Sequence, residues 1–250
     1  MPAVEGMSGL AKGLAVLETF SSATPKLTIS DAARLTDLHR AVARRCLLTL
    51  VELGYLTHDG KYFFPTPRVL RLGDTYVETA ALPQLAQPHL AAAREQLRES
   101  VSLAVWQNDE ALFVARAEIL RIVNTGVRIG VALPAYASAT GHVLLAGLAP
   151  AELEAYLDRC RPRARTPKTP TRRETIHQRV EQARTEQAAF TDEELEIGLR
   201  SMAVPVRDSR GHTVAAMSVS ATASRISPDQ LRTRFLPVLR DHATQLGRTL

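Results

Sequence analysis

Residues 27–64 read LTISDAARLTDLHRAVARRCLLTLVELGYLTHDGKYFF, and this stretch decides the fold of the first part of the chain. Thr28 and Asp31 have the spacing of a capping box, which predicts that a short helix begins there. A tight turn separates it from a second helix, predicted over 39–53, which Gly54 is suited to end. Two short strands around an Asp-Gly turn then form a hairpin.

The segment before this stretch completes the unit. Apolar residues at 10, 14, 17 and 20 recur at the helical spacing, and Ser, Thr and Pro residues end that helix. Three helices followed by a hairpin are the elements of a winged helix-turn-helix. We place this domain over residues 1–67.

The helix over 39–53 carries three arginines away from its apolar face. Arg40 and Arg44 lie four residues apart and share a face, and each guanidinium could donate two hydrogen bonds to a guanine. Arg45 lies farther round and could reach flanking phosphates. A solvated arginine-rich face is the alternative, but the preceding helix, turn and wing favour DNA. The predicted DNA contacts are His39, Arg40, Arg44, Arg45 and Lys61.

Composition sets the broad class of protein. The 250 residues, 45% of them hydrophobic, suffice for two modest domains with ordinary cores. No apolar run approaches the roughly 20 residues of a membrane span, and no signal-peptide pattern opens the chain, so we expect a cytoplasmic protein without membrane contact. Cys46, Cys160 and the histidines match no metal-ligand spacing, so we expect no metal and no cofactor.

The net charge of +5 is a weak argument for DNA binding, because most of the excess positive charge lies outside the predicted winged domain. Residues 1–66 hold seven Lys or Arg against six Asp or Glu. Much of the excess lies at 159–173, where Pro and Thr prevent a regular helix and a mobile surface loop is the plain interpretation. Local geometry must therefore carry the DNA prediction.

A second domain follows a linker. Apolar residues at 69, 72, 76 and 80 predict an amphipathic linker helix over 68–82. Pro83 and Pro88 are expected to separate it from a helix that ends near Leu97. The remaining domain, 83–250, then mixes strands with helices.

Hydrophobic alternation after residue 100 predicts a hairpin with its turn at 108–110. Hairpin-linked strands among helices indicate an α+β domain with an antiparallel sheet. Ser227 and Gln230 have capping-box spacing before the last helix. Further strands are predicted over 119–125, 127–133, 201–207 and 214–220, and helices over 140–147, 151–157, 174–187 and 228–250.

Three later segments join the first stretch in resembling one family. They are PTPRVLRLG at 65–73, LPAYASATGHVLLA at 133–146 and DEELEIGLRSMAVPVRDSRG at 192–211. With 27–56, they resemble the IclR family of bacterial transcriptional regulators, in family order and over nearly the whole chain. The residues in these segments look most like those of the branch that controls aromatic-acid catabolism through protocatechuate and β-ketoadipate.

The resemblance implies a winged helix-turn-helix joined by a linker helix to a GAF-like effector domain. It also implies a homodimer, or a dimer of dimers, that binds a palindromic double-stranded operator and a small organic acid, aromatic or dicarboxylic. The effector contacts that it implies are Ile122, Thr125, Ala139, Thr140, Gly141, Leu199, Ser201, Ser218 and Ser220.

Physical arguments support part of this set. Thr140 and Gly141 lie where a loop enters a helix, and exposed amides there could hold a carboxylate. Ser218 and Ser220 alternate along one strand, so their hydroxyls face the same side. A helix cap at Thr140 and a solvent-facing edge strand at the serines are the alternatives. Arg116 and Arg121 could pair with an acidic ligand or be surface cations.

Some positions depart from the family pattern. Asp37 stands where glycine is usual in the turn, although Asp tolerates the left-handed conformation. His39 stands where Ser or Thr usually caps the recognition helix, which removes a favoured cap. Thr140 and His142 replace the Met and Arg common in the aromatic-acid branch, so we expect a different ligand.

Two other functions compete with a regulator. One is an enzyme that acts on a small organic acid and carries an accessory winged module, although no GxSxG, P-loop, GxGxxG or HExxH motif occurs. Its best acid–base candidate, DEELE at 192–196, is more simply a solvated segment before a strand. The other is a winged protein-interaction module that does not bind DNA.

Overall fold

The computed structural model describes residues 6–21, 23–119 and 127–250. The chain divides into two compact units, Met1–Glu78 and Thr79–Leu250, which we call the winged unit and the sensor unit. Each has its own hydrophobic core. None of the helices in these described ranges combines the length and apolar character that a membrane-spanning segment needs.

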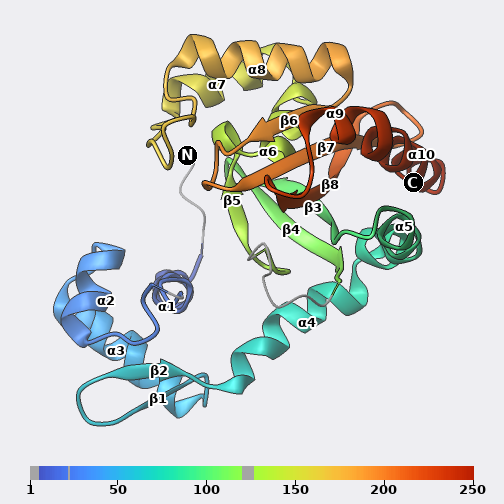
Figure 1. Ribbon diagram of the computed structural model, residues 1–250. Helices are drawn as coiled ribbons and strands as arrows, with labels where there is room; N and C mark the ends of the chain where they lie inside the picture. The colour runs from blue at the N-terminus through green and yellow to red at the C-terminus, as the bar shows by residue number, and fades with distance from the viewer. Residues whose placement is uncertain (1–5, 22, 120–126) are drawn as a thin grey trace. The chain divides into compact units, whose positions relative to one another are not determined.

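The winged unit contains the three helices and the hairpin that the sequence predicts (Figure 1). Thr28 and Asp31 form a capping box, in which the Thr28 hydroxyl accepts from the Asp31 amide at 3.2 Å and Asp31 accepts from the Thr28 amide at 3.0 Å. The elements are α1 (Ser8–Glu18), α2 (Ile29–Thr36), α3 (Arg40–Glu52), β1 (Leu56–His58) and β2 (Phe63–Pro65).

One apolar cluster holds these elements together. It takes one side chain from α1, several from α3 and one from each strand of the hairpin. An isolated bridge between Leu27 and Phe63 ties the segment before α2 to the wing. The buried members are Val16, Leu27, Ala32, Ala43, Leu47, Leu50, Leu56 and Phe63.

The turn between α2 and α3 has the conformation that the sequence suggests. Asp37 adopts φ +53°, the left-handed conformation that Asp tolerates better than most residues. His39 lacks the hydroxyl of the favoured Ser or Thr cap, as the sequence shows, yet α3 still has a side-chain cap. His39 Nδ1 accepts a long hydrogen bond, 3.4 Å, from the Ala41 amide, so imidazole replaces the usual hydroxyl at this position.

The linker differs from the predicted single helix over 68–82. A helix, α4 (Leu70–Thr79), is followed by one non-helical residue, Ala80, and α5 (Ala81–Leu97) begins directly after that residue. Both Pro83 and Pro88 lie inside α5 instead of preceding it. Pro83 falls in the first turn, where a missing N–H costs nothing, and the buried face of α5 outweighs the cost of Pro88.

The sensor unit is built on a six-stranded antiparallel sheet in the order β5-β4-β3-β8-β7-β6. The predicted hairpin turn is present, with Asn108 and Asp109 both at positive φ. A short strand at 189–192 was not predicted. The strands are β3 (Val101–Gln107), β4 (Glu110–Ala117), β5 (Ala132–Pro134), β6 (Ala189–Asp192), β7 (Leu199–Arg207) and β8 (Thr213–Thr222).

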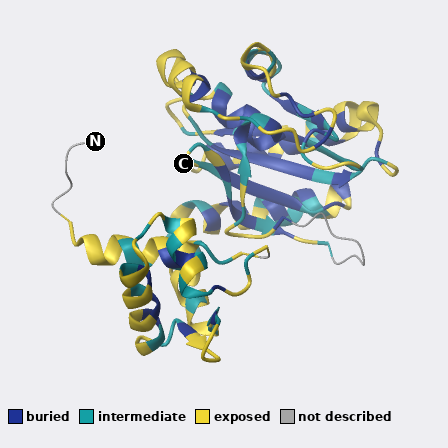
Figure 2. Cartoon of the chain, turned by 90° about the vertical axis from the view of Figure 1, so that its left-hand side faces the viewer, coloured by how far each residue is buried: buried dark blue, intermediate teal, exposed yellow. Residues whose placement is uncertain are grey.

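Helices cover both faces of this sheet (Figures 1 and 2). On one face, α5 and α10 (Leu236–Gly247) bury Leu90 and Leu239 against Leu103, Val204 and Met217. On the other, α6 (Ala139–Ala146) packs against alanines of the central strands. The remaining helices are α7 (Pro150–Arg159), α8 (Arg173–Glu186) and α9 (Pro228–Gln230), and Ser227 caps α9 as predicted. The sensor unit is thus an α+β domain.

Candidate functional site

The first candidate site is the outward face of α3. Arg40, Arg44 and Arg45 are all exposed, whereas Ala43 and Leu47 on the opposite face are fully buried. Among the described residues, no carboxylate lies within 4 Å of any of the three guanidiniums. Three cations on one helix without internal partners are available to an external anion.

The wing adds a further cation next to an ordered turn. The carboxylate of Asp59 accepts hydrogen bonds from the amides of Lys61 (2.9 Å) and Tyr62 (2.8 Å), and these bonds lower the pKa of Asp59. The Lys61 ammonium lies 5.1 Å from the centre of the Tyr62 ring, and that of Lys26 lies 4.3 Å from it. The hairpin therefore presents Lys61 at a fixed tip, and Lys26, from the segment before α2, lies against the same ring.

The second candidate site is a row of polar side chains across the central strands of the sensor unit. In the register of the sheet, Ser102 on β3 lies opposite both Arg116 on β4 and Ser218 on β8. One step along, Ser201 on β7 lies opposite Ser220, and their hydroxyl oxygens are 2.8 Å apart. We call these five residues the polar row.

The polar row faces the side of the sheet that α6 covers. Ser218 and Ser220 alternate with Met217 and Val219, which belong to the core on the opposite face. The prediction that the two hydroxyls share a side is thus confirmed. The alternative of a solvent-facing edge strand is wrong, because β7 and β8 are interior strands and Ser218 is 4% exposed.

Arg116 is the charged member of the row. Its guanidinium donates to the Ser102 hydroxyl at 2.9 Å and lies 3.6 Å from the Glu118 carboxylate. Only 7% of the side chain is exposed, and this burial lowers the pKa of Arg116 despite the opposing effect of Glu118. Of the two interpretations of Arg116, the surface cation is wrong.

Ser102 belongs to this row although the sequence did not single it out. The register of the predicted hairpin could have identified Ser102 from the sequence. Pairing of β3 with β4 across a two-residue turn, with one bulge, sets Ser102 directly against Arg116. A serine between the buried Val101 and Leu103 also alternates onto the opposite face.

The expectation of exposed amides at Thr140 and Gly141 is wrong. Ser138 caps α6, and its hydroxyl accepts from the Gly141 amide at 3.1 Å. Thr140, Gly141 and the neighbouring Ala139 are all buried. A carboxylate cannot reach the Gly141 amide, which is buried and bonded to Ser138. The alternative of a helix cap at Thr140 is wrong as well, because Ser138 is the cap and Thr140 lies inside α6.

Of the other implied effector residues, some lie in the described part of the sensor unit and some do not. Leu199 is half-buried at the start of β7, opposite Thr222, and shares its face with Ser201 two residues on. Ile122, Thr125 and Arg121 lie outside the described residues.

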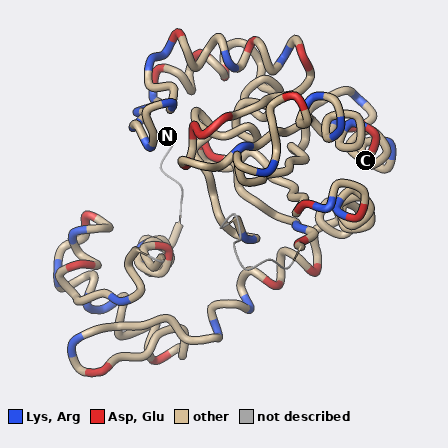
Figure 3. The backbone as a smooth tube through the Cα atoms, viewed as in Figure 1, with Lys and Arg blue, Asp and Glu red and all other residues tan. Residues whose placement is uncertain are grey.

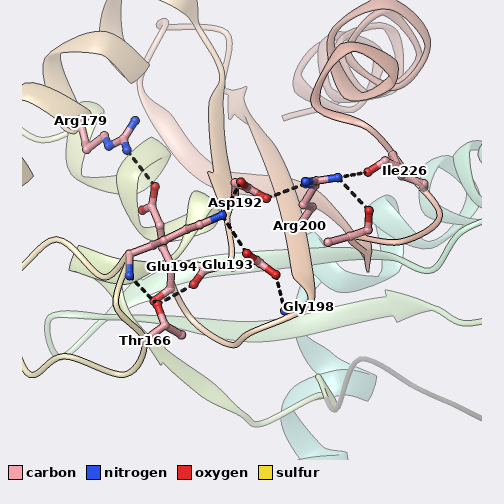
Figure 4. Close-up of polar contacts among 10 residues, drawn as sticks. Thr166, Arg179, Asp192, Glu193, Glu194, Gly198, Arg200 and Ile226 are labelled. Carbon is pink, nitrogen blue, oxygen red and sulfur yellow. Dashed lines mark hydrogen bonds and ion pairs between the residues drawn. The ribbon is translucent and has the colours of Figure 1, made fainter.

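The acidic segment at 192–196 is not the solvated run that we expected (Figure 4). Glu194 is 3% exposed, and its carboxylate lies 3.1 Å from the Arg179 guanidinium. Burial raises the pKa of Glu194 to about 7, with Arg179 acting in the opposite direction. Asp192 is held by Arg200 at 2.5 Å, and the pKa of Asp192 is lowered, mainly by hydrogen bonds from Lys168 and Arg200.

His142 has a structural place in the core. It is 1% exposed, and its Nε2 lies 2.9 Å from the Tyr136 carbonyl oxygen. Burial lowers the pKa of His142 to about 4, so the ring is neutral at physiological pH. Within the described ranges, no three His, Cys, Asp or Glu side chains converge as metal ligands would.

Comparison with known proteins agrees with both halves of this architecture. Residues 9–60 match the model of the IclR helix-turn-helix domain, and residues 74–248 match that of the bacterial transcriptional regulator IclR C-terminal domain. The two models together span most of the chain, in the order of its two units.

Relatives of known name are similar over nearly their full lengths. The Pca regulon regulatory protein of Pseudomonas putida is 39% identical over 93% of this chain and 80% of its own. The p-hydroxybenzoate hydroxylase transcriptional activator of Acinetobacter baylyi is 36% identical over 96% and 90%. An IclR homologue from Microbacterium hydrocarbonoxydans, solved in complex with 4-hydroxybenzoate, is 27% identical, with a TM-score of 0.75 over 96% of this chain and 98% of that one.

These similarities decide between the competing functions. The predicted regulator is confirmed against the enzyme, because both domain models and the named relatives are those of transcriptional regulators. This chain belongs to the IclR family of bacterial transcriptional regulators.

Proposed function

We propose that the chain binds its operator through α3 and the wing and responds to a small aromatic acid bound over the polar row. DNA binding would place it in the cytoplasm, where bacterial DNA is. A homodimer, or a dimer of dimers, on a palindromic operator follows from the need to place two α3 helices in successive major grooves. The sign of regulation, activation or repression, is left open.

Exposed and unpaired arginines on α3 support the operator contact. Arg40 and Arg44 would read base edges, while His39, Arg45 and Lys61 would contact phosphates. The Arg44→Ala variant should weaken operator binding by about 1 to 3 kcal/mol and relax the preference at one base pair. Fluorescence polarisation with the DNA upstream of the coding region measures both effects.

Arg71 provides the matched control for this experiment. It is an exposed arginine on α4, in the same unit but outside the recognition helix. Arg71→Ala removes the same charge and should leave the base preference unchanged. Operator affinity that stays at the wild-type value in Arg44→Ala would remove Arg44 from the interface, and loss of preference in both variants would point to a structural effect.

A buried guanidinium beside serine hydroxyls supports an acidic ligand. Arg116 would hold a carboxylate by charge-assisted hydrogen bonds, which gain strength away from water. Ser218, Ser220 and Ser201 would accept or donate to a ring hydroxyl, and Leu199 would contact the ring. We keep Ile122 and Thr125 as proposed effector contacts because of the family resemblance. We no longer propose that the Gly141 amide binds the carboxylate. The relatives that are named for hydroxybenzoate chemistry make aromatic acids the first to test.

Two serines allow a direct test of this site. Replacing Ser218 and Ser220 together by Ala removes two hydroxyls without adding bulk. Calorimetric affinity for the tightest-binding member of a panel of hydroxybenzoates and dicarboxylic acids should fall about tenfold, since removing one hydrogen bond to a ligand costs about 0.5 to 1.5 kcal/mol. Ser224→Ala, at an exposed position beyond β8, is the control. Unchanged affinity in the double variant excludes these serines from the pocket.

A further inference from the structure

We propose that the segment 159–173, the basic loop, is a second DNA-contacting surface that binds phosphates without regard to base sequence. The inference rests on the proposed operator binding and goes beyond it, because it assigns a DNA contact to the sensor unit.

The position of the positive charge is the first argument. The basic loop holds seven of the 31 Lys and Arg residues and no Asp or Glu, which leaves 24 basic against 26 acidic residues in the remainder of the chain. Without the loop, the protein would carry a net charge of −2. Non-specific affinity for DNA depends on cations that displace the counterions of the phosphates, and the loop holds the largest local excess of such cations in the sequence.

The partners of these cations are the second argument. Three of the seven are neutralised within the sensor unit: Arg159 by Asp109, Lys168 by Asp192 and Glu193, and Arg173 by Glu154 and Asp158. The other four are exposed, and in the described part of the chain no carboxylate lies within 4 Å of them. These four cations without a carboxylate partner are Arg161, Arg163, Arg165 and Arg172. The Arg161 guanidinium donates to the backbone carbonyls of Asp158 (2.8 Å) and Cys160 (2.9 Å), which do not neutralise its charge.

The third argument is that the loop is held in place (Figure 4). The Tyr136 hydroxyl donates to the Arg163 carbonyl at 3.0 Å and accepts from the Arg163 amide at 3.1 Å. The buried Thr166 donates to the Glu193 carbonyl at 2.6 Å. The buried Thr169 donates to the Glu194 carbonyl, also at 2.6 Å. Hydrogen bonds thus tie the loop to the sensor unit at Arg163, Thr166 and Thr169, where the sequence suggested a mobile surface loop.

Order and free charge together indicate a binding surface. A basic segment that served only solubility would need no hydroxyl anchors between its arginines, such as those at Arg163, Thr166 and Thr169. Fixing the backbone in advance lowers the entropy cost of binding, and planar guanidiniums suit the bidentate recognition of phosphate. Lys and Arg positions follow one another along this loop (Figure 3), as a surface that touches successive phosphates requires.

The test compares salt dependence on DNA without an operator. In the loop variant, Arg161, Arg163, Arg165 and Arg172 are all replaced by Gln in the full chain. Binding to a scrambled duplex is measured by fluorescence polarisation between about 50 and 200 mM salt. Removing one ion pair with a phosphate should flatten the slope of log K against log salt by about 0.9, so we expect a change of about 2 to 4.

A charge-matched control separates a local interaction with DNA from the effect of net charge. Arg128, Arg207, Arg210 and Arg248 are also exposed and lie in the sensor unit outside the basic loop. Their replacement by Gln changes the net charge equally and should shift the slope by less than about 1. A version of the loop variant with Lys in place of Gln should keep the wild-type slope, because a lysine still neutralises a phosphate.

Three outcomes would overturn the inference: a wild-type slope in the Gln loop variant, an equal flattening in the control, or a flattened slope in the Lys version. The first of these would be expected if the loop docks an acidic protein surface. Thermal unfolding, followed by circular dichroism, verifies that each variant is folded. The operator preference of Arg44→Ala reports separately on the proposed function, because the scrambled duplex contains no operator.

Discussion

At the scale of one residue, the carboxylate of Glu194 is buried in the sensor unit, and its desolvation disfavours the charged form. Its Oε2 has no hydrogen-bond partner among the described residues, and the charges of the half-exposed Arg179 and of Lys168 oppose its desolvation only in part. With the pKa of Glu194 raised to about 7, the folded protein holds a proton that the unfolded chain releases near pH 4.5. This contribution to stability is complete below pH 4.5 and disappears as pH rises through 7.

Glu194→Gln should therefore remove much of the pH dependence of folding. Between about pH 5 and pH 8, the decrease in unfolding free energy should be about 2 to 3 kcal/mol smaller in the variant than in the wild type. Urea titrations at both pH values measure the difference. Glu196→Gln, exposed in the same segment, is the control. A variant with the wild-type pH dependence would show that Glu194 is ionised at low cost.

At the scale of the element, Gly141 allows α6 to lie close to the turn before it. A Cβ built on Gly141 would lie 2.2 Å from the Ala135 Cα and 2.3 Å from its carbonyl oxygen. Both are backbone atoms, which cannot rotate away. Glycine therefore fixes the packing of α6 beneath the sheet, beside the polar row.

Gly141→Ala should lower the free energy of unfolding by about 2 kcal/mol or more, because overpacking forces the backbone apart. Gly73→Ala on α4 provides the opposite case, since a Cβ there would have no atom within 4 Å. That substitution should raise helix stability by about 0.5 to 1 kcal/mol. Thermal or urea unfolding of the two variants measures both changes, and equal effects would contradict the close approach at Gly141.

Sequence patterns predicted the elements that local interactions determine. The capping boxes at Thr28 and Ser227 each lie within four residues, and the turn before α3 depends only on the left-handed backbone conformation of Asp37. β6 was missed because four residues contain too little alternation to be distinguished from a loop. The α5 prolines and the burial of Glu194 were wrongly predicted, since tertiary packing decides them.

The same distinction applies to the candidate sites. Exposed arginines on α3 follow from helical periodicity alone, so the DNA contacts could be named from the sequence. The polar row joins residues from four strands, and Ser102 and Arg116 enter it only through strand register. The anchored basic loop depends on hydroxyls that bond to carbonyls more than 20 residues away.

At the scale of the whole molecule, the proposed reading of the operator and the proposed binding of the effector use separate units with separate cores. Each function should then be removable without the other. Arg44→Ala should retain the wild-type calorimetric affinity for the effector, and the Ser218 and Ser220 double variant should retain operator affinity when no effector is present. Loss of both activities in either variant would mean that the units do not fold independently.

Coupling between the units is the remaining property of an effector-responsive regulator, and it is reciprocal. If the effector changes operator affinity by some factor, operator DNA must change effector affinity by the same factor, typically about 5- to 150-fold for a coupling of about 1 to 3 kcal/mol. Polarisation with and without effector gives the first factor, and calorimetry with and without operator gives the second. The Ser218 and Ser220 double variant should lose the response because the ligand no longer occupies its site. An operator affinity that no bound acid alters in the wild type would leave this chain a DNA-binding protein without the proposed sensing function.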